Sequence, residues 1–154
     1  GIKGGSTAAA VTCLPGGVHW CTVGDSRVYL FRGGRLIALN EDSDYMNVLI
    51  ERVIAGQITF EEAGGDSKKD ALAQYVGYKG GVFPDGNSKP FVPRKNDKLL
   101  LCSDGVYNAL TPSELMESLR LEASEAARDI ENRVLAKHYS NQDNFTAVVL
   151  GFIR

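Results

Sequence analysis

The first forty residues predict a series of short strands joined by tight turns. Four runs of small, β-branched and aromatic residues are separated by turns rich in glycine. The runs are residues 7–14, 18–23, 28–31 and 36–39. Because these strands follow one another without an intervening helix, we expect an antiparallel sheet and not an alternating βαβ order.

The middle of the chain predicts an excursion away from this sheet. Apolar residues recur at helical spacing from Met46 to Ile54, and Gly56 ends the pattern. Thr59-Phe60-Glu61-Glu62 has the form of a capping box that opens a second, short helix. We expect a further strand at 71–76, then a loop with a turn at Asp85-Gly86 and a short strand at Phe91-Val92. Residues 42–76 form the kind of flap-like excursion that often covers a site.

The last third predicts one buried strand, two helices and a final strand. Leu99-Leu100-Leu101-Cys102 is apolar without alternation, which is typical of a strand buried on both faces, and it stops on Ser103-Asp104-Gly105. Thr111-Pro112-Ser113-Glu114 is a second capping box with proline at the first helical position. A longer helix is expected over about 124–138 and the last strand over 145–153. The whole pattern predicts a single α+β domain over 1–154, with helices packed on an antiparallel β core.

Composition excludes several classes of protein. The 154 residues suffice for one domain with a substantial core. The 17 Lys and Arg nearly balance the 19 Asp and Glu, so no basic surface argues for nucleic acid or an anionic membrane. No apolar run reaches the length of a membrane span, and the opening residues 1–5 do not resemble a signal peptide. Cys13, Cys21 and Cys102 all lie in apolar runs, so we expect buried, reduced thiols and a cytoplasmic location.

Three aspartates, Asp25, Asp104 and Asp143, share one setting. Each lies where an apolar strand meets a turn, and carboxylates at the ends of strands of one sheet can converge. Converging carboxylates repel one another, so at neutral pH they need a cation or shared protons. Oxygen ligands without His or Cys favour Mg²⁺ or Mn²⁺, and a water bound to such an ion is the nucleophile that phosphate-ester hydrolysis needs. Three unrelated turn aspartates are the alternative.

The order of the motifs around these aspartates resembles a known family. The motifs are Gly24-Asp25-Ser26-Arg27, Cys102-Ser103-Asp104-Gly105 and Gln142-Asp143-Asn144-Phe145-Thr146. In this order they are similar to those of the metal-dependent serine/threonine protein phosphatases of the PPM, or type 2C, family. Gly5-Ser6-Thr7 and the segment Ala55-Gly56-Gln57-Ile58-Thr59 are similar to further stretches of its bacterial members.

The resemblance implies a β-sandwich of two antiparallel sheets flanked by helices, the αββα arrangement. It implies that Asp104 and Asp143 are ligands of a paired Mn²⁺ or Mg²⁺ centre. Asp25 would help Asp104 to hold a third ion, and Asn144 would support the ligand Asp143 without binding metal. Residues 42–76 would be the flap beside the substrate groove, and the substrate would be a protein phosphorylated on serine or threonine.

Two motifs that precede the G-S-T strand in this family are absent, one of the R-x-x-N-E-D kind and one of the form D-G-x-G-G. Asp85-Gly86 and Asp104-Gly105 do not continue as the second motif does. We therefore expect an incomplete, C-terminal portion of a phosphatase domain that lacks the first strands and helices, binds metal weakly and is inactive alone. The missing part could instead come from another chain, or the chain could be a non-catalytic PPM-like binding or regulatory module.

Other candidate residues have simpler interpretations. His19 and His138 have no nucleophile near them in the sequence, so we expect structural roles. Arg27 is expected to pair with a neighbouring carboxylate and not with phosphate. A phosphoacceptor aspartate at Asp104 would need a parallel α/β order, which the early hairpins argue against.

Overall fold

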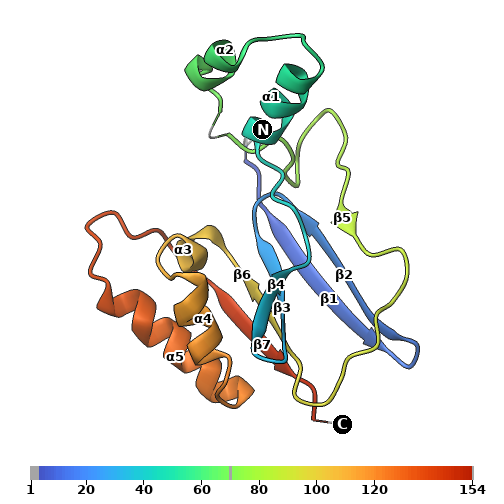
Figure 1. Ribbon diagram of the computed structural model, residues 1–154, viewed down its shortest axis with the longest axis vertical. Coiled ribbons are helices and arrows are strands. Elements are labelled where there is room, and N and C mark those ends of the chain that lie inside the picture. Colours follow the sequence, from blue (N-terminus) through green and yellow to red (C-terminus); the bar gives the residue numbers. More distant parts are fainter. Residues whose placement is uncertain (1–3, 70, 154) are drawn as a thin grey trace.

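Two antiparallel β-sheets lie face to face in the computed structural model, which describes residues 4–69 and 71–153 (Figure 1). The first sheet has the order β1-β2-β5 and the second the order β4-β3-β6-β7. The strands are β1 (Ala8–Leu14), β2 (Gly17–Val23), β3 (Arg27–Arg32), β4 (Arg35–Ala38), β5 (Asp85–Gly86), β6 (Lys98–Cys102) and β7 (Ala147–Gly151). The predicted α+β class and the sandwich of antiparallel sheets are therefore confirmed.

The first sheet is built on the predicted β1–β2 hairpin. Gly17 has φ +127°, and a Cβ there would lie 2.6 Å from the carbonyl oxygen of Phe91, so only glycine fits. The expected turn at Asp85-Gly86 is wrong, because these residues pair with Thr22 and Cys21 as the short strand β5. Sequence periodicity does not detect a strand of two residues, whose position here depends on the pairing partner. Phe91 forms an isolated bridge to Val18 and not a strand.

The second sheet carries the most buried strands. β3 and β6 are its two central strands, and Leu99 and Leu100 of β6 are both fully buried, on opposite faces. Val28, Leu30 and Leu99 point toward the first sheet and form the core between the sheets. Leu100 and its neighbours on the other face pack against the helices. The absence of alternation in Leu99–Cys102 thus reflects burial from both sides.

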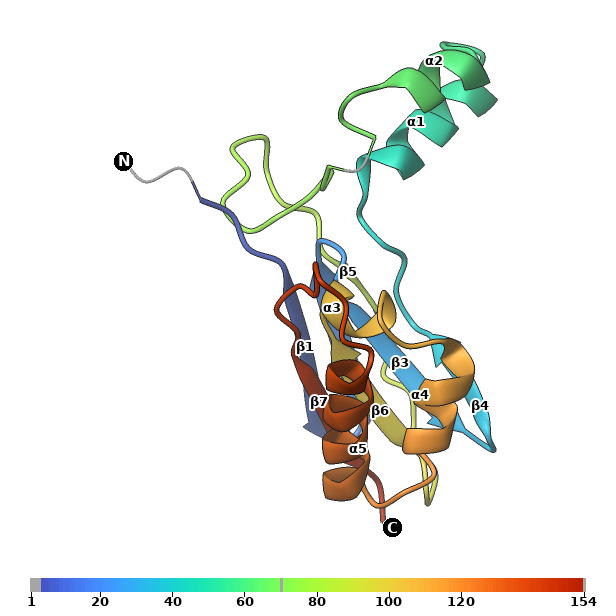
Figure 2. The same ribbon diagram turned by 90° about the vertical axis from the view of Figure 1, so that its left-hand side faces the viewer.

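Three helices cover the outer face of the second sheet (Figure 2). They are α3 (Asp104–Tyr107), α4 (Pro112–Ser118) and α5 (Ala123–Ala136). The predicted capping box is present, since the Thr111 hydroxyl accepts from the Glu114 amide and the Glu114 carboxylate accepts from the Thr111 amide. α3 was not predicted, because four residues are too few to show helical periodicity.

Two further helices, α1 (Tyr45–Ile54) and α2 (Phe60–Gly65), stand away from the sheets at one end of the molecule (Figures 1 and 2). The predicted capping box at Thr59 and Glu62 opens α2. The strand expected at 71–76 is wrong: the structure has only isolated bridges from Leu72 and Val76 there. Without a continuous neighbouring strand, this segment has no ladder of hydrogen bonds to join. Asp70 lies outside the described residues.

The expectation of three buried cysteines is wrong for two of them. Cys102 is buried, but Cys13 and Cys21 are exposed. β1 is an edge strand, and Cys21 is on the face of its sheet that points away from the core between the sheets. The opening residues 1–3 lie outside the described part of the chain. In that described part, no helix is both long and apolar enough to cross a bilayer.

Candidate metal centre

Asp104 stands at the junction of β6 and α3. It is the first residue of α3, directly after the buried strand and Ser103. The backbone of Ser103 donates to the Thr146 carbonyl at 3.1 Å, and the Thr146 backbone donates to the Ser103 hydroxyl at 3.0 Å. These two bonds continue the β6–β7 pairing beyond the sheet. They therefore hold the segment before β7 beside the start of α3.

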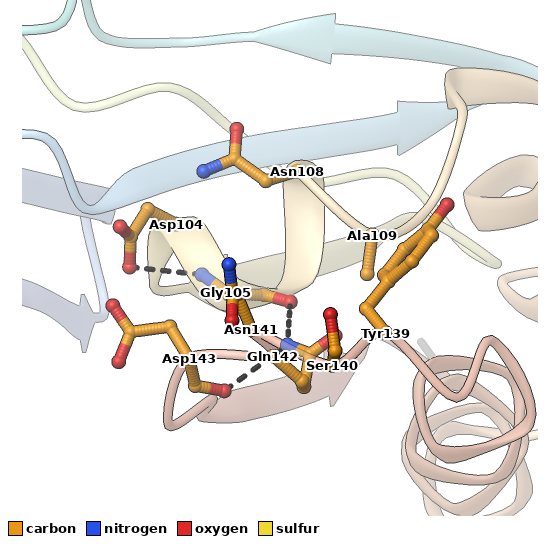
Figure 3. Close-up of a pocket in the computed structure, with 9 residues that line it drawn as sticks. All are labelled: Asp104, Gly105, Asn108, Ala109, Tyr139, Ser140, Asn141, Gln142 and Asp143. Atoms are coloured by element: carbon orange, nitrogen blue, oxygen red, sulfur yellow. Dashed lines mark hydrogen bonds between the residues drawn. The ribbon is translucent and has the colours of Figure 1, made fainter.

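Asp143 lies in that segment, a few residues before β7. The Gln142 side chain donates to the Gly105 carbonyl at 3.1 Å and so ties the segment to α3 (Figure 3). A Cβ on Gly105 would lie 2.6 Å from the Asn144 carbonyl oxygen, so the two backbones can approach this closely only with glycine at 105. This close approach brings Asp104 and Asp143 together.

The two carboxylates line one pocket of about 460 Å³ (Figure 3). The residues that line it are Asp104, Gly105, Asn108, Ala109, Tyr139, Ser140, Asn141, Gln142 and Asp143. None of them is basic, so the two negative charges meet amide, hydroxyl and backbone groups only. Such a pocket attracts a cation and repels an anion unless a cation is bound.

Asp25 lies close enough to Asp104 for the two charges to interact. It lies in the β2–β3 turn, where the chain passes from the first sheet to the second. Burial raises the pKa of the Asp25 carboxyl, and the nearby charge of Asp104 raises it further. Asp104 and Asp143 flank the β6–β7 pair. Asp25 lies on the crossover from the first sheet to β3, whose first residue pairs with the last residue of β6.

The oxygen donors fit a hard divalent cation, but the set is incomplete. Within residues 4–69 and 71–153, no three His, Cys, Asp or Glu side chains are grouped closely enough to hold a metal ion. Asp104 and Asp143 share a pocket, and the charge of Asp104 acts on Asp25. Mg²⁺ and Mn²⁺ accept such partial carboxylate sets, since they retain several waters. The Asn144 backbone donates to the Asp143 carboxylate at 2.7 Å; a supporting role for its side chain stays a prediction.

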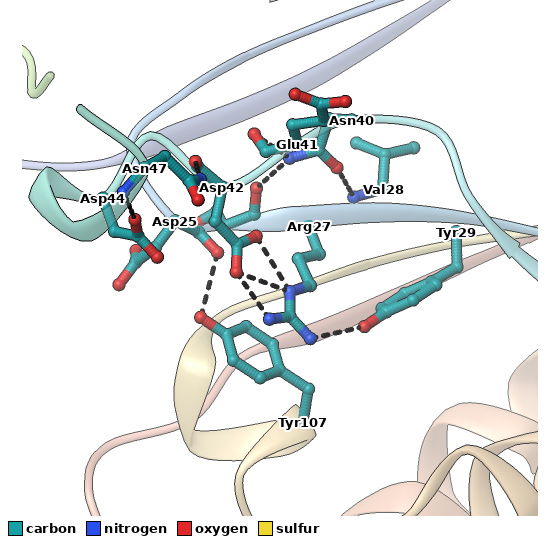
Figure 4. Close-up of polar contacts among 11 residues, drawn as sticks. Asp25, Arg27, Val28, Tyr29, Asn40, Glu41, Asp42, Asp44, Asn47 and Tyr107 are labelled. Atoms are coloured by element: carbon teal, nitrogen blue, oxygen red, sulfur yellow. Dashed lines mark hydrogen bonds and ion pairs between the residues drawn. The ribbon is translucent and has the colours of Figure 1, made fainter. Parts of the chain in front are cut away.

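Arg27 pairs with a carboxylate, as expected from the sequence. Its Nε and Nη2 donate to the two oxygens of Asp42 at 2.9 and 2.5 Å (Figure 4). Its Nη1 donates to the Tyr29 hydroxyl at 3.0 Å, and its guanidinium lies 3.5 Å from the centre of the Tyr107 ring. These hydrogen bonds raise the pKa of Arg27, chiefly through Asp42, so the side chain stays charged. Sequence analysis missed Asp42 and Tyr107, whose positions depend on the tertiary fold.

Comparisons with known proteins agree with this geometry. The serine/threonine phosphatase Stp of Listeria welshimeri is 31% identical over 146 residues, covering 95% of this chain and 56% of the relative. The solved PPM Ser-Thr phosphatase MsPP of Mycobacterium smegmatis matches with a TM-score of 0.72 and 26% identity, over 96% of this chain and 62% of that structure. A solved catalytic domain of the phosphatase PstP, in complex with 2 manganese ions, matches with a TM-score of 0.67 and 26% identity, over 94% and 57%.

In fold and sequence, the chain is similar to protein serine/threonine phosphatases. These relatives and solved structures are of the PPM, or type 2C, kind that the motifs indicated. The chain spans little more than half the length of the curated relatives that it matches. No family model matches the chain.

Proposed function

We propose that this chain forms part of a metal-dependent protein serine/threonine phosphatase and supplies one side of its metal centre. The substrate would be a protein phosphorylated on serine or threonine, and the reaction would be hydrolysis of its phosphate ester. The observation that carries the proposal is the shared pocket of Asp104 and Asp143, which lie on segments 39 residues apart in the sequence (143 − 104 = 39).

The carboxylates of Asp104 and Asp143 would hold Mn²⁺ or Mg²⁺ from two sides, and Asp25 would add a ligand beside Asp104. A bound divalent ion supplies the positive charge that activates a water for attack and stabilises the phosphoryl group in the transition state. The chain's own contribution is to position these oxygens. Gly105 allows the close approach of the two backbones, and the Ser103–Thr146 bonds fix it.

The residues that line the pocket bear on whether this chain can bind a substrate by itself. A phosphate ester carries negative charge, and none of the nine residues that line the pocket can neutralise it. We propose that residues outside this chain add to the bound cation in holding the substrate, which agrees with its span of 56% of the first relative. We propose that the purified 154-residue chain binds metal weakly and has little or no phosphatase activity alone. Rapid, Mn²⁺-dependent phosphate release by this chain would contradict that proposal.

A chimaera tests the proposed activity directly. The chain would replace the 146 matching residues of the Listeria phosphatase, and phosphate release from a phosphothreonine peptide would be measured with Mn²⁺. The chimaera should hydrolyse the peptide, and Asp104→Asn or Asp143→Asn should reduce the rate by at least about a hundredfold. Glu131→Gln, at an exposed position of α5 outside both the pocket and residues 42–76, is the control and should leave the rate unchanged.

The second candidate function is a non-catalytic PPM-like binding or regulatory module. It would be favoured if the chimaera has the circular dichroism and thermal transition of a folded protein but shows no Mn²⁺-dependent activity. The clustered carboxylates favour the phosphatase, because a module without metal gains nothing from holding like charges together.

Three further proposals concern the domain, its completion and its setting. We propose that the chain forms one domain and that residues 42–76, which contain α1 and α2, act as a flap beside the substrate groove. We propose that the missing part of the sandwich comes from the rest of a longer chain. A cytoplasmic location and a role in phosphorylation signalling stay predictions; the three free thiols support the former.

A further inference from the structure

The β2–β3 turn that carries Asp25 is fixed from several directions. The Thr7 and Ser26 hydroxyls are hydrogen-bonded at 2.9 Å, and the Ser43 backbone donates to the Gly24 carbonyl at 3.0 Å. The buried Asn40 side chain accepts from the Val28 backbone at 2.7 Å and donates to the Ser26 carbonyl at 3.1 Å. The turn is thus held mainly by the segment that leads from β4 to α1.

Tyr107 connects the same turn to α3. Its hydroxyl donates to the Asp25 carbonyl at 3.1 Å, although the two residues are 82 positions apart. Tyr107 is the last residue of α3, and Asp104 is the first. One short helix therefore carries both the candidate ligand Asp104 and the side chain that holds the backbone of Asp25.

Arg27 joins these two connections in one cluster (Figure 4). Its guanidinium lies over the Tyr107 ring, 3.5 Å from the ring centre, and forms a two-point ion pair with Asp42 of the segment before α1. Neither charged partner is fully exposed: the side chains are 29% and 19% accessible. A planar, forked guanidinium can make both contacts at once, whereas an ammonium group cannot.

Resting on the metal site proposed above, we propose that Arg27 is a positioning residue for that site. With Asp42 and Tyr107 it forms a clamp that keeps Asp25 against Asp104, so that one divalent cation contacts both. The clamp also links the cation to the segment that enters α1. Cation binding should therefore favour the ordered conformation of residues 42–44, and that conformation should in turn favour cation binding.

The alternative is that Arg27 only stabilises the fold. The chain offers a matched control on the same strand. Arg32, near the other end of β3, forms the same two-point pair with Asp97, at 3.0 and 2.6 Å, and its side chain is 26% accessible. Among the described residues, none of the hydrogen bonds or ion pairs of Arg32 involves Asp25, Asp104 or Tyr107. Its replacement therefore disrupts a two-point ion pair on the same strand without touching the clamp, although Asp97, at 2% accessible, is more buried than Asp42.

The test is an NMR titration of the 154-residue chain with Mg²⁺, which reports weak binding at individual amides. In the wild type, the amide resonances of Asp25 and Asp104 should shift with one common midpoint. In Arg27→Lys, the Mg²⁺ concentration at the midpoint of the Asp104 shift should rise about tenfold, the usual effect of losing a group that orients a ligand. The Asp25 resonance should then shift with a different midpoint. Tyr107→Phe keeps the ring but loses the hydroxyl, so it should show a smaller rise with the same separation. Arg32→Lys should titrate as the wild type does.

The outcomes separate the two proposals. If neither Asp25 nor Asp104 responds to Mg²⁺ in the wild type, the metal site is wrong and the clamp falls with it. If the wild type responds but Arg27→Lys keeps the common midpoint, the clamp is overturned and the metal site stands. If Arg32→Lys weakens binding as much as Arg27→Lys, the effect is one of general stability and the clamp is also overturned.

Discussion

Gly105 offers the sharpest test of how the pocket is built. A Cβ at this position would lie 2.6 Å from the Asn144 carbonyl oxygen and 3.0 Å from the Phe145 Cβ. Both are closer than ordinary van der Waals contact, and the first is with backbone, which cannot rotate away as a side chain can. Gly105→Ala must therefore push α3 and the segment before β7 apart, and Asp104 and Asp143 separate with them.

The magnitude follows from two opposing terms. Forcing one extra methyl group into a packed site costs about 1–3 kcal/mol. Replacing glycine by alanine within a helix returns about 0.5–1 kcal/mol, because the unfolded chain loses conformational freedom. We therefore expect the free energy of unfolding to fall by about 1–2 kcal/mol. Metal affinity should fall as well, since the two carboxylates lose their shared geometry.

Urea denaturation followed by the fluorescence of Trp20, the single tryptophan, measures the stability change. Gly64→Ala is the control, because a Cβ on that helical glycine meets nothing within 4 Å. It should be neutral or slightly stabilising. If Gly105→Ala is as stable as the wild type and binds Mn²⁺ as well, the close approach does not hold the pocket together and this reasoning is refuted.

Two further predictions concern the rest of the fold. Leu99→Ala, in the core between the sheets, should lower the free energy of unfolding by about 2–5 kcal/mol. Leu14→Ala, at a side chain that is 56% exposed, should change it by less than about 0.5 kcal/mol. Thermal melts that show equal losses of stability in the two variants would contradict the placement of Leu99 in the core. The Lys137 ammonium, 2.6 Å away, and the Thr111 cap lower the pKa of Glu114 to about 2, so the stability it contributes is present above its unfolded pKa and is lost as pH falls toward 2. Acid titrations should show a weaker loss of stability over that range in Glu114→Gln, and a profile identical to the wild type would refute the pairing.

Much of the fold could be predicted because its signals are local. The hairpins, the capping boxes at Thr59 and Thr111 and the buried strand at Leu99 each depend on a few neighbouring residues. The errors occur where the structure depends on distant partners. β5 exists because Asp85-Gly86 meets β2, and residues 71–76 are not a strand because no continuous strand lies beside them.

The same division holds for the candidate site. The motif order indicated Asp25, Asp104 and Asp143, and the structure brings Asp104 and Asp143 to one pocket. Sequence reasoning could not find that Tyr107 holds the Asp25 backbone, because that contact spans 82 residues and depends on how α3 packs. It also could not show that Asp25 lies where the chain crosses from the first sheet to the second.

Calorimetric titration of the chain with Mn²⁺ tests the central claim most directly. The wild type should bind, and Asp104→Asn and Asp143→Asn should each weaken binding by at least about tenfold, while Glu131→Gln should not. Binding that is the same in all four proteins, or undetectable in the wild type, would contradict the assignment of this pocket as a metal centre.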